Sequence, residues 1–434
     1  MSLLSRLVAP TARHDVARLV AALLAEHSGV RPEGPAEEFV SRTGPPRGPV
    51  LPTGPTGLGT SAARIAARRK EVEGTGRRKE VEDIGRRQGV EGGAGVPELY
   101  CPPALRDDPA LAEEVNTRLL AWAEEIGLYA GRLNRVRAAD FGRLMMLAHP
   151  DTDDPDRLLA AGKCALAEWA TDDYYCDDET MGSAPVLLGA QLGVAYAAID
   201  PAHPPLRYVP AVERAMQDDP VRTALRSGFA HMARYADSSQ LARLRHEVAV
   251  LFVGYGQEGS WRSQDRMPAV WEYLAHRQFN SFVPCVAMTD MVGGYVLPAA
   301  EYAEPRVRRA VTMASTAATL VNDLYSMAKE HHSDGVEFNL PTVIAAEERC
   351  TPREAVQRSA AIHDELVRTF EAEAAALALT GSPQLRRFLT GVWAWLGGNR
   401  AWHSGSRRYT SNPADTPSNT SSNTPSGTSS GPLS

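Results

Sequence analysis

The chain has 434 residues, of which 43% are hydrophobic and 23% charged, and its formal net charge is −7 at pH 7. No apolar run approaches the ~18 residues that a membrane-spanning helix requires, and the acidic balance argues against the clustered basic face of a nucleic-acid-binding protein. Five cysteines without C-x-x-C spacing argue against a disulfide framework and a structural zinc site, so we expect a cytoplasmic protein.

Residues 1–95 form the first region of distinct composition. They contain no Trp, Tyr or Cys, Phe39 is their only aromatic residue, and Gly and Pro are frequent. Such a segment cannot bury enough apolar surface to offset an ordering cost of about 1–2 kcal/mol per residue. We therefore predict a disordered extension there, with at most a weak helix at 14–26. A second disordered tail, rich in Ser, Thr and Pro, is predicted over 411–434.

The region between these extensions, 96–410, is predicted to be one folded domain. It holds all seven Trp and all five Cys, and its apolar residues recur at helical spacing without a run that alternates as a strand would. The clearest helical periods cover 111–129, 156–175, 269–279, 308–330, 353–379 and 384–403. The fold class is therefore all-α, with about ten or more helices.

The densest group of ionisable residues is T-D-D-Y-Y-C-D-D-E, at 171–179, where an apolar helix ends. With 3.6 residues per turn, Trp169, Asp172 and Asp173 share one stripe of this helix, and Asp177 lies at its margin. Burying like charges together is costly unless a cation binds them, and Mg²⁺ prefers carboxylate oxygens. The alternative for this motif alone is a solvated helix end.

A second polar signature follows about 150 residues later. Asn322, Ser326 and Glu330 stand at i, i+4 and i+8, so they lie on one side of a helix and offer oxygen donors to a hard cation. A solvated helix end is again the alternative, and Lys329 would then be an ordinary surface residue. Together, the two signatures predict divalent ions at the mouth of a hydrophobic cavity. Mg²⁺ usually completes its shell with substrate phosphates, so the substrate would be a phosphate or diphosphate joined to an apolar body.

These two motifs resemble the paired metal-binding motifs of class I terpene cyclases. D-D-Y-Y-C-D (172–177) is similar to the aspartate-rich motif, and N-D-L-Y-S-M-A-K-E (322–330) is similar to the N-D-x-x-S-x-x-x-E motif. Arg277 precedes the second motif where the family has its diphosphate-sensing arginine, and Arg408-Tyr409 match the family's late Arg-Tyr pair. The resemblance covers roughly 98–410 and implies an α-helical bundle around a central apolar cavity.

The resemblance also implies the chemistry, which is ionisation of an allylic diphosphate followed by cyclisation. Three Mg²⁺ ions would be bound by the carboxylate, amide and hydroxyl groups of Asp172, Asp173, Asp177, Asn322, Ser326 and Glu330. Diphosphate binding would fall to Arg277, Lys329, Arg408 and Tyr409. Asp172, Arg277, Arg408 and Tyr409 are the expected catalytic residues. Trp169, deeper on the same stripe as the aspartates, is the first candidate for the cavity wall.

Within the family, the exact form of both motifs and the long leader most resemble the bacterial cyclases of 2-methylgeranyl diphosphate, which a separate methyltransferase supplies. The family allows a homodimer. Other mono- and sesquiterpene cyclases remain alternatives, while an isoprenyl diphosphate synthase would need a second D-D-x-x-D motif, and a non-catalytic helical scaffold would show repeats. One departure stands out, because Asn280-Ser281 follow the sensor arginine where many relatives have Asp-Gly.

Overall fold

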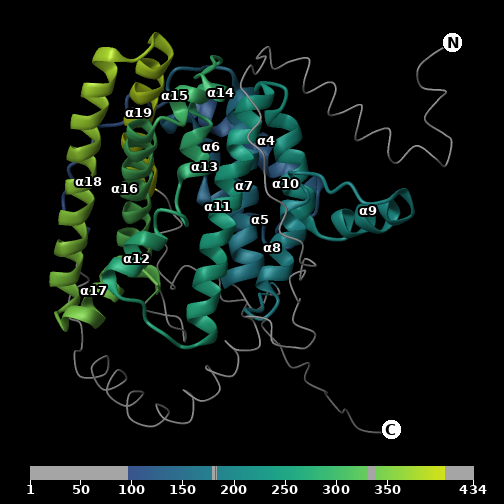
Figure 1. The fold of residues 1–434 in the computed structure, drawn as a ribbon, viewed down its shortest axis with the longest axis horizontal. Helices are drawn as coiled ribbons and strands as arrows, with labels where there is room; N and C mark the ends of the chain where they lie inside the picture. The colour runs from purple at the N-terminus through teal and green to yellow at the C-terminus, as the bar shows by residue number, and fades with distance from the viewer. Residues whose placement is uncertain (1–95, 178–180, 182, 331–337, 406–434) are drawn as a thin grey trace, which may run out of the picture. The chain divides into compact units, whose positions relative to one another are not determined.

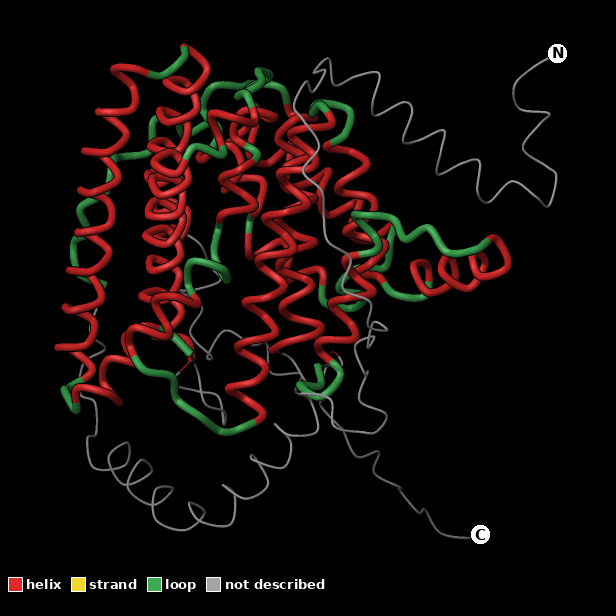
Figure 2. Tube along the Cα trace, viewed as in Figure 1, coloured by secondary structure: helices red, strands yellow, loops and turns green. Residues whose placement is uncertain are grey.

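The computed structural model describes residues 96–177, 181, 183–330 and 338–405. Every regular element in these residues is a helix (Figure 2), so the all-α prediction is confirmed. The predicted disordered extensions, 1–95 and 411–434, lie outside the described residues. No described helix has both the length and the apolar content needed to cross a membrane.

The first half of the described region consists of α4 (Pro109–Glu125), α5 (Leu133–Ala139), α6 (Phe141–Ala148), α7 (Pro155–Asp172), the π-helix η2 (Asp173–Asp177), α8 (Leu188–Tyr196), the 3₁₀-helix η4 (Leu206–Tyr208), α9 (Val209–Gln217) and α10 (Pro220–Met232). The second half consists of α11 (Ser238–Ser263), α12 (Val270–His276), α13 (Val283–Ala287), α14 (Thr289–Val292), α15 (Ala299–Tyr302), α16 (Pro305–Glu330), α17 (Leu340–Glu348), α18 (Pro352–Thr380) and α19 (Pro383–Gly405).

The six segments with the clearest helical period correspond to α4, α7, α12, α16, α18 and α19. The helical period of the sequence did not single out the long helix α11, although a start signal is present. Asp237 caps this helix and accepts a hydrogen bond from the backbone N–H of Gln240, whose side chain accepts from the N–H of Asp237 in return. Such a capping box satisfies two backbone donors that a helix start leaves without intrahelical partners.

The two helices that carry the predicted metal motifs run in the same direction. At the start of α7, Arg157 donates to the carbonyl of Met291 on α14 at 2.9 Å. At the start of α16, Arg308 donates to the hydroxyl of Tyr302 on α15 at 2.6 Å. Figure 1 shows α14 and α15 at one end of the bundle and α12 and α17 at the other. Both motif helices therefore direct their C-terminal ends away from α14 and α15.

The apolar core joins both groups of helices. One large cluster of buried side chains runs through α4, α6, α7, α10, α11, α13, α16, α18 and α19. A smaller cluster packs the end of α11 against α12 and α17 through Trp261, Tyr273, Leu340 and Val343. Burial of one such large apolar side chain contributes about 1.5–3 kcal/mol. Leu320 of α16 belongs to the same cluster, so the cluster anchors α12 against α16.

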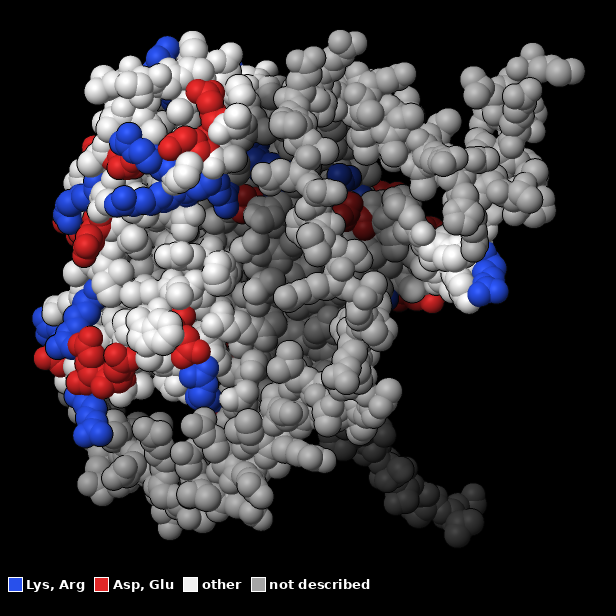
Figure 3. Space-filling model, in the orientation of Figure 1, with Lys and Arg blue, Asp and Glu red and all other residues white. Residues whose placement is uncertain are grey.

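Charged side chains of both signs lie interspersed on the face drawn in Figure 3.

Candidate functional site

The first motif begins at the last turn of α7 and continues through η2. Asp172 is the last residue of α7, Asp173 begins the π-helix, and both are half-buried. A π-helix pairs residues five apart, whereas an α-helix pairs residues four apart. The backbone therefore brings position 177 one turn beyond position 172, which explains why a regular α-helical period put Asp177 at the margin of the stripe. The side chain of Asp177 lies outside the described part.

Trp169 belongs to an aromatic cluster that we define as Phe141, Trp169, Phe282, Trp395, Trp402 and His403. The indole of Trp169 meets the ring of Phe141 edge-on at 5.0 Å between centroids, and that of Trp402 edge-on at 6.2 Å. The ring centroid of Phe282 lies 5.3 Å from that of Trp169. Trp169 is only half-buried, whereas Trp402 is fully buried. The aromatic cluster thus lies one turn before the first motif.

The second motif reaches the same aromatic cluster from α16. Asn322 and Ser326 are half-buried, and the side-chain nitrogen of Asn322 lies 3.4 Å from Nε2 of His403. The ring of His403 meets that of Trp402 at 4.6 Å, and Trp402 in turn meets Trp169. The end of α19 therefore connects the two motif helices. Lys329 and Glu330 end α16, and their side chains lie outside the described part.

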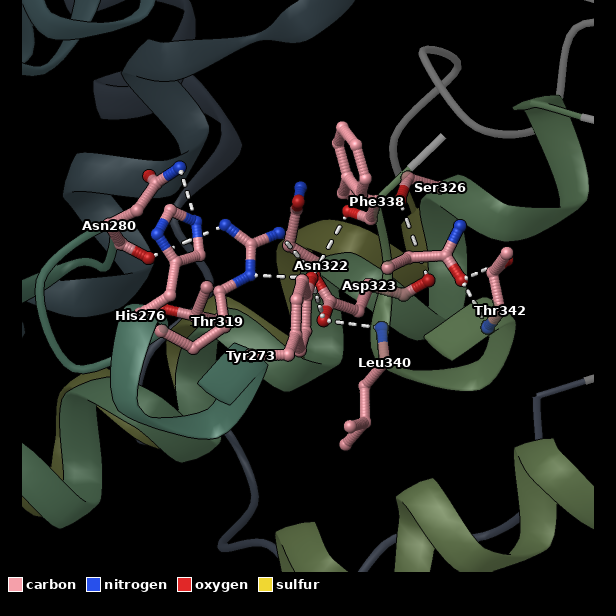
Figure 4. Close-up of polar contacts among 12 residues, drawn as sticks. Tyr273, His276, Asn280, Thr319, Asn322, Asp323, Ser326, Phe338, Leu340 and Thr342 are labelled. Carbon is pink, nitrogen blue, oxygen red and sulfur yellow. Dashed lines mark hydrogen bonds and ion pairs between the residues drawn. The ribbon is translucent and has the colours of Figure 1, made fainter. Parts of the chain in front are cut away.

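Asp323, which was not among the predicted site residues, is completely buried beside the second motif. It accepts hydrogen bonds from the hydroxyl of Tyr273 at 2.8 Å and from the backbone N–H of Leu340 at 3.0 Å, and it forms an ion pair with Arg277 (Figure 4). Adjacent helical residues point about 100° apart. The side chain of Asp323 therefore lies on a different face of α16 from that of Asn322, and it points toward α12.

The predicted sensor, Arg277, directly follows α12. Its Nε donates to the hydroxyl of Tyr273 at 2.8 Å, and a terminal nitrogen binds Asp323. Burial alone would lower the pKa of Arg277, but the charges of Asp323 and its other acidic neighbours hold that pKa well above its usual value. In this structure Arg277 is thus a fixed cation that the second motif helix holds through Asp323.

Between α12 and α13 the helical path breaks, and Asn280 lies in that break. Its side-chain amide donates to Oε2 of Glu258 on α11 at 3.1 Å. A Cβ on Gly254 would lie 2.7 Å from the backbone nitrogen of Asn280, so the glycine lets the break approach α11 closely. The departure from the family pattern at Asn280 thus coincides with a direct contact to α11.

Glu258 also connects the break to the first motif. Arg262 donates to Oε1 of Glu258 at 2.6 Å and to the backbone carbonyl of Cys176, within η2, at 3.2 Å. Burial raises the pKa of Glu258, but the hydrogen bond from His276 and the charge of Arg262 outweigh it and hold that pKa well below its usual range. We call Glu258, Arg262, His276 and Asn280 the Glu258 network.

Among the described side chains, no three His, Cys, Asp or Glu residues are grouped closely enough to hold a metal ion by themselves. The motifs nevertheless bring half-buried carboxylate, amide and hydroxyl groups to the same end of the bundle. These are the donors that a hard divalent cation such as Mg²⁺ prefers. Asp172, Asp173, Asn322 and Ser326 are the described donors, while Arg408 and Tyr409 lie outside the described residues.

Comparison with known proteins agrees with this arrangement. Residues 163–369, which include both motifs, match the model for "Terpene synthase family 2, C-terminal metal binding". The chain is 42% identical to a 2-methylisoborneol synthase of Streptomyces ambofaciens over 353 residues, which cover 81% of this chain and 78% of the relative. The chain belongs to the terpene synthase family.

The chain is also similar to a solved structure and to a relative that cyclises a different substrate. The structure of 2-methylisoborneol synthase from Streptomyces coelicolor A3(2), in complex with Mg²⁺ and 2-fluoroneryl diphosphate, matches with a TM-score of 0.70 and 43% identity, covering 73% of this chain and 98% of that one. A (+)-T-muurolol synthase of Streptomyces clavuligerus that cyclises farnesyl diphosphate is 30% identical over 316 residues, 72% of this chain and 73% of the relative. The expected family and fold are therefore confirmed.

Proposed function

We propose that the chain is a Mg²⁺-dependent terpene cyclase that converts (E)-2-methylgeranyl diphosphate and water to 2-methylisoborneol and diphosphate. The observation that carries this proposal is the high identity to 2-methylisoborneol synthases over most of both chains. The placement of two oxygen-donor motifs at one end of the bundle supports it independently, because ionising a diphosphate requires cations near the leaving group.

The metal ligands would be Asp172, Asp173 and Asp177 on the first motif helix, and Asn322, Ser326 and Glu330 on the second. Six residues with oxygen-donor side chains, from two helices, suit a cluster of three Mg²⁺ ions that completes its shell with diphosphate and water. When bound, Mg²⁺ neutralises the negative charge that develops on the departing diphosphate.

The diphosphate itself would be bound by Arg277, Lys329, Arg408 and Tyr409. A guanidinium has five N–H donors, so Arg277 can keep its ion pair with Asp323 while it also donates to a phosphate oxygen. Arg277 would then contact the diphosphate and α16 at the same time, since its partner Asp323 lies on α16 directly after Asn322 of the second motif.

The apolar part of the substrate would lie against the aromatic cluster, with Trp169 as part of the wall. Aromatic faces stabilise a nearby positive charge by about 0.5–2 kcal/mol each. The half-buried Trp169 lies one turn before Asp172 on α7. A carbocation formed below the diphosphate would therefore lie close to an aromatic face.

The substrate indicates which enzyme must work alongside this one. The extra methyl group must be added by a separate methyltransferase that acts on geranyl diphosphate, so we propose that the two enzymes share the cytoplasm. All five cysteines are free thiols in the described residues, which suits a reducing compartment. A homodimer stays a prediction.

Parallel incubations with geranyl, 2-methylgeranyl and farnesyl diphosphate, each with and without Mg²⁺, test the function. We expect Mg²⁺-dependent diphosphate release, and 2-methylisoborneol as the main product from the C11 substrate by gas chromatography. A main product of 2-methylenebornane would show that deprotonation, and not water capture, ends the cascade. Preferential turnover of farnesyl diphosphate would favour a sesquiterpene cyclase, the second candidate, which the 30% identity to a farnesyl-cyclising relative supports.

A further inference from the structure

The segment that joins α4 to α5 has an unusual backbone beside the first motif. Gly127, Tyr129 and Gly131 all have positive φ, at +72°, +53° and +74°. Glycine adopts this left-handed region without a steric penalty, whereas a bulky residue is strained there and stays only where its surroundings fix it. The chain has glycine at the two outer positions and tyrosine at the middle one. The side chain at position 129 is thus present in spite of the strain.

Tyr129 is held at both ends by the first motif. Its hydroxyl donates to Oδ2 of Asp173 at 2.6 Å, and its backbone N–H donates to the hydroxyl oxygen of Tyr174 at 2.8 Å. The two tyrosine rings meet edge-on, with centroids 5.6 Å apart, and Tyr129 is only 3% exposed. Two consecutive residues of η2 therefore contact one strained residue that lies 44 and 45 positions earlier in the chain.

A hydrogen bond to one oxygen of a carboxylate limits its rotation, and therefore sets the direction of the other oxygen. Partners that bind the ligands of a metal, and not the metal itself, orient those ligands and raise the affinity of the site. The hydroxyl of Tyr129 stands in this relation to Asp173. Because Tyr129 is almost completely buried, solvent cannot easily replace that bond.

We propose that Tyr129 is a positioning residue that orients the Asp173 carboxylate for Mg²⁺, and that the α4–α5 segment thereby supports the first metal motif. This proposal rests on the proposed function, because it takes the first motif to be a magnesium site. Tyr129 acts through Asp173 and does not touch the reacting atoms.

The test measures Mg²⁺ affinity by two readouts. The first is the rise in melting temperature as the protein is titrated with Mg²⁺ in the presence of inorganic diphosphate, and the second is the Mg²⁺ dependence of turnover. For Tyr129→Phe we expect the half-saturating Mg²⁺ concentration to increase by about 10–100-fold in both, the usual effect of removing such a partner. An unchanged half-saturating concentration in a folded Tyr129→Phe variant would overturn the proposal.

Tyr235→Phe is the matched control. The hydroxyl of Tyr235 donates to Asp156 in the first turn of α7, whereas Tyr129 binds Asp173 in η2, which directly continues α7. This variant therefore also removes one tyrosine–aspartate hydrogen bond, at the opposite end of α7. Its Mg²⁺ affinity should equal that of the wild type. An equal loss in both variants would mean that any weakening of α7 lowers the affinity, and would overturn the specific role of Tyr129.

Two more variants complete the test. Asp173→Asn combined with Tyr129→Phe should bind Mg²⁺ no more weakly than Asp173→Asn alone, because Tyr129 acts through that carboxylate; additive losses would contradict the proposal. If Tyr129→Phe does not fold, Tyr174→Phe removes the acceptor for the Tyr129 N–H, and wild-type Mg²⁺ affinity there would overturn the proposal. The melting titration needs no turnover, so it remains readable even if no diphosphate is cyclised and the proposed function fails.

Discussion

Two buried carboxylates on α11 have similar partners but connect different parts of the molecule. Glu247 accepts hydrogen bonds from Arg308 at 2.5 and 3.2 Å and from the hydroxyl of Tyr302 at 3.1 Å. Glu258, three turns later, accepts from Arg262 and Asn280. The partners of Glu247 belong to α15 and the start of α16, whereas the Glu258 network reaches η2 and the break after α12. A buried ion pair therefore does not mark a functional site by itself; the elements that it joins do.

The largest expected effect is the loss of turnover when a predicted metal ligand is replaced. This loss should exceed the loss caused by replacing Glu247 or Glu258. In Asp172→Ala or Asn322→Ala, Mg²⁺-dependent turnover should fall by at least about 10³-fold, because several kcal/mol of charge stabilisation on the leaving group is lost. Circular dichroism should still show the helical content of the wild type. Glu247→Gln should keep its turnover. Wild-type turnover in both alanine variants would refute the assignment of these residues as metal ligands.

A second variant tests whether Arg277 depends on its buried partner. Asp323→Asn keeps the shape of the side chain but leaves the Arg277 charge uncompensated, and breaking a buried pair in this way costs about 3–5 kcal/mol of unfolding free energy. Urea unfolding should show a loss of this size for Asp323→Asn. Glu247→Gln, which does the same to Arg308, should lose comparable stability, but only Asp323→Asn should also raise KM for the diphosphate. Equal KM values would contradict a link between Asp323 and diphosphate binding.

Glu258→Gln tests whether Glu258 has a role in turnover that Glu247 lacks. Glutamine keeps an acceptor for Asn280 but removes the charge that faces Arg262, so the break and η2 should lose their fixed relation. We expect kcat to decrease by about 10–100-fold, the effect typical of residues that orient a ligand shell. Glu247→Gln should change kcat by less than about twofold, in line with substitutions away from the site. Equal kcat values for the two variants would show that the networks are interchangeable.

The smallest effect concerns a third buried carboxylate, Glu168, which accepts a hydrogen bond from the thiol of Cys285 at 3.5 Å. Burial raises the pKa of Glu168 to about 8, and the Cys285 bond opposes this only in part. The folded chain therefore keeps a proton that the unfolded chain releases near pH 4.5. The stability that the Glu168 carboxyl contributes is fully present below pH 4.5 and is lost as the pH rises through 8.

Glu168→Gln removes this dependence on pH. The difference in unfolding free energy between variant and wild type should shift in favour of the variant by an amount on the order of a few kcal/mol between pH 5 and pH 8, since one pKa unit corresponds to 1.36 kcal/mol. Chemical unfolding of both proteins at the two pH values measures it. A constant difference would show that Glu168 is ionised in the folded protein throughout this range.

The sequence predicts the helical class and the long amphipathic helices because each of these depends on local period and on caps. It also predicts that Trp169 lies close to the first motif, since the two are one turn apart. The ion pair of Arg277 with Asp323 and the bond from Tyr129 to Asp173 join residues 46 and 44 positions apart. Periodicity contains no information on such contacts. A regular period of 3.6 residues also fails at η2, where the backbone changes its hydrogen-bond pattern.

That change of pattern limits how the first motif can be transplanted. If D-D-Y-Y-C-D were grafted onto a straight α-helix of a designed bundle, its final carboxylate would be displaced sideways from the first one, because residues five apart do not align there. The graft would reproduce the amino-acid sequence of the motif and not the positions of its carboxylates. A designer would have to transfer the wider turn together with Arg262, which binds the backbone carbonyl of Cys176 within it.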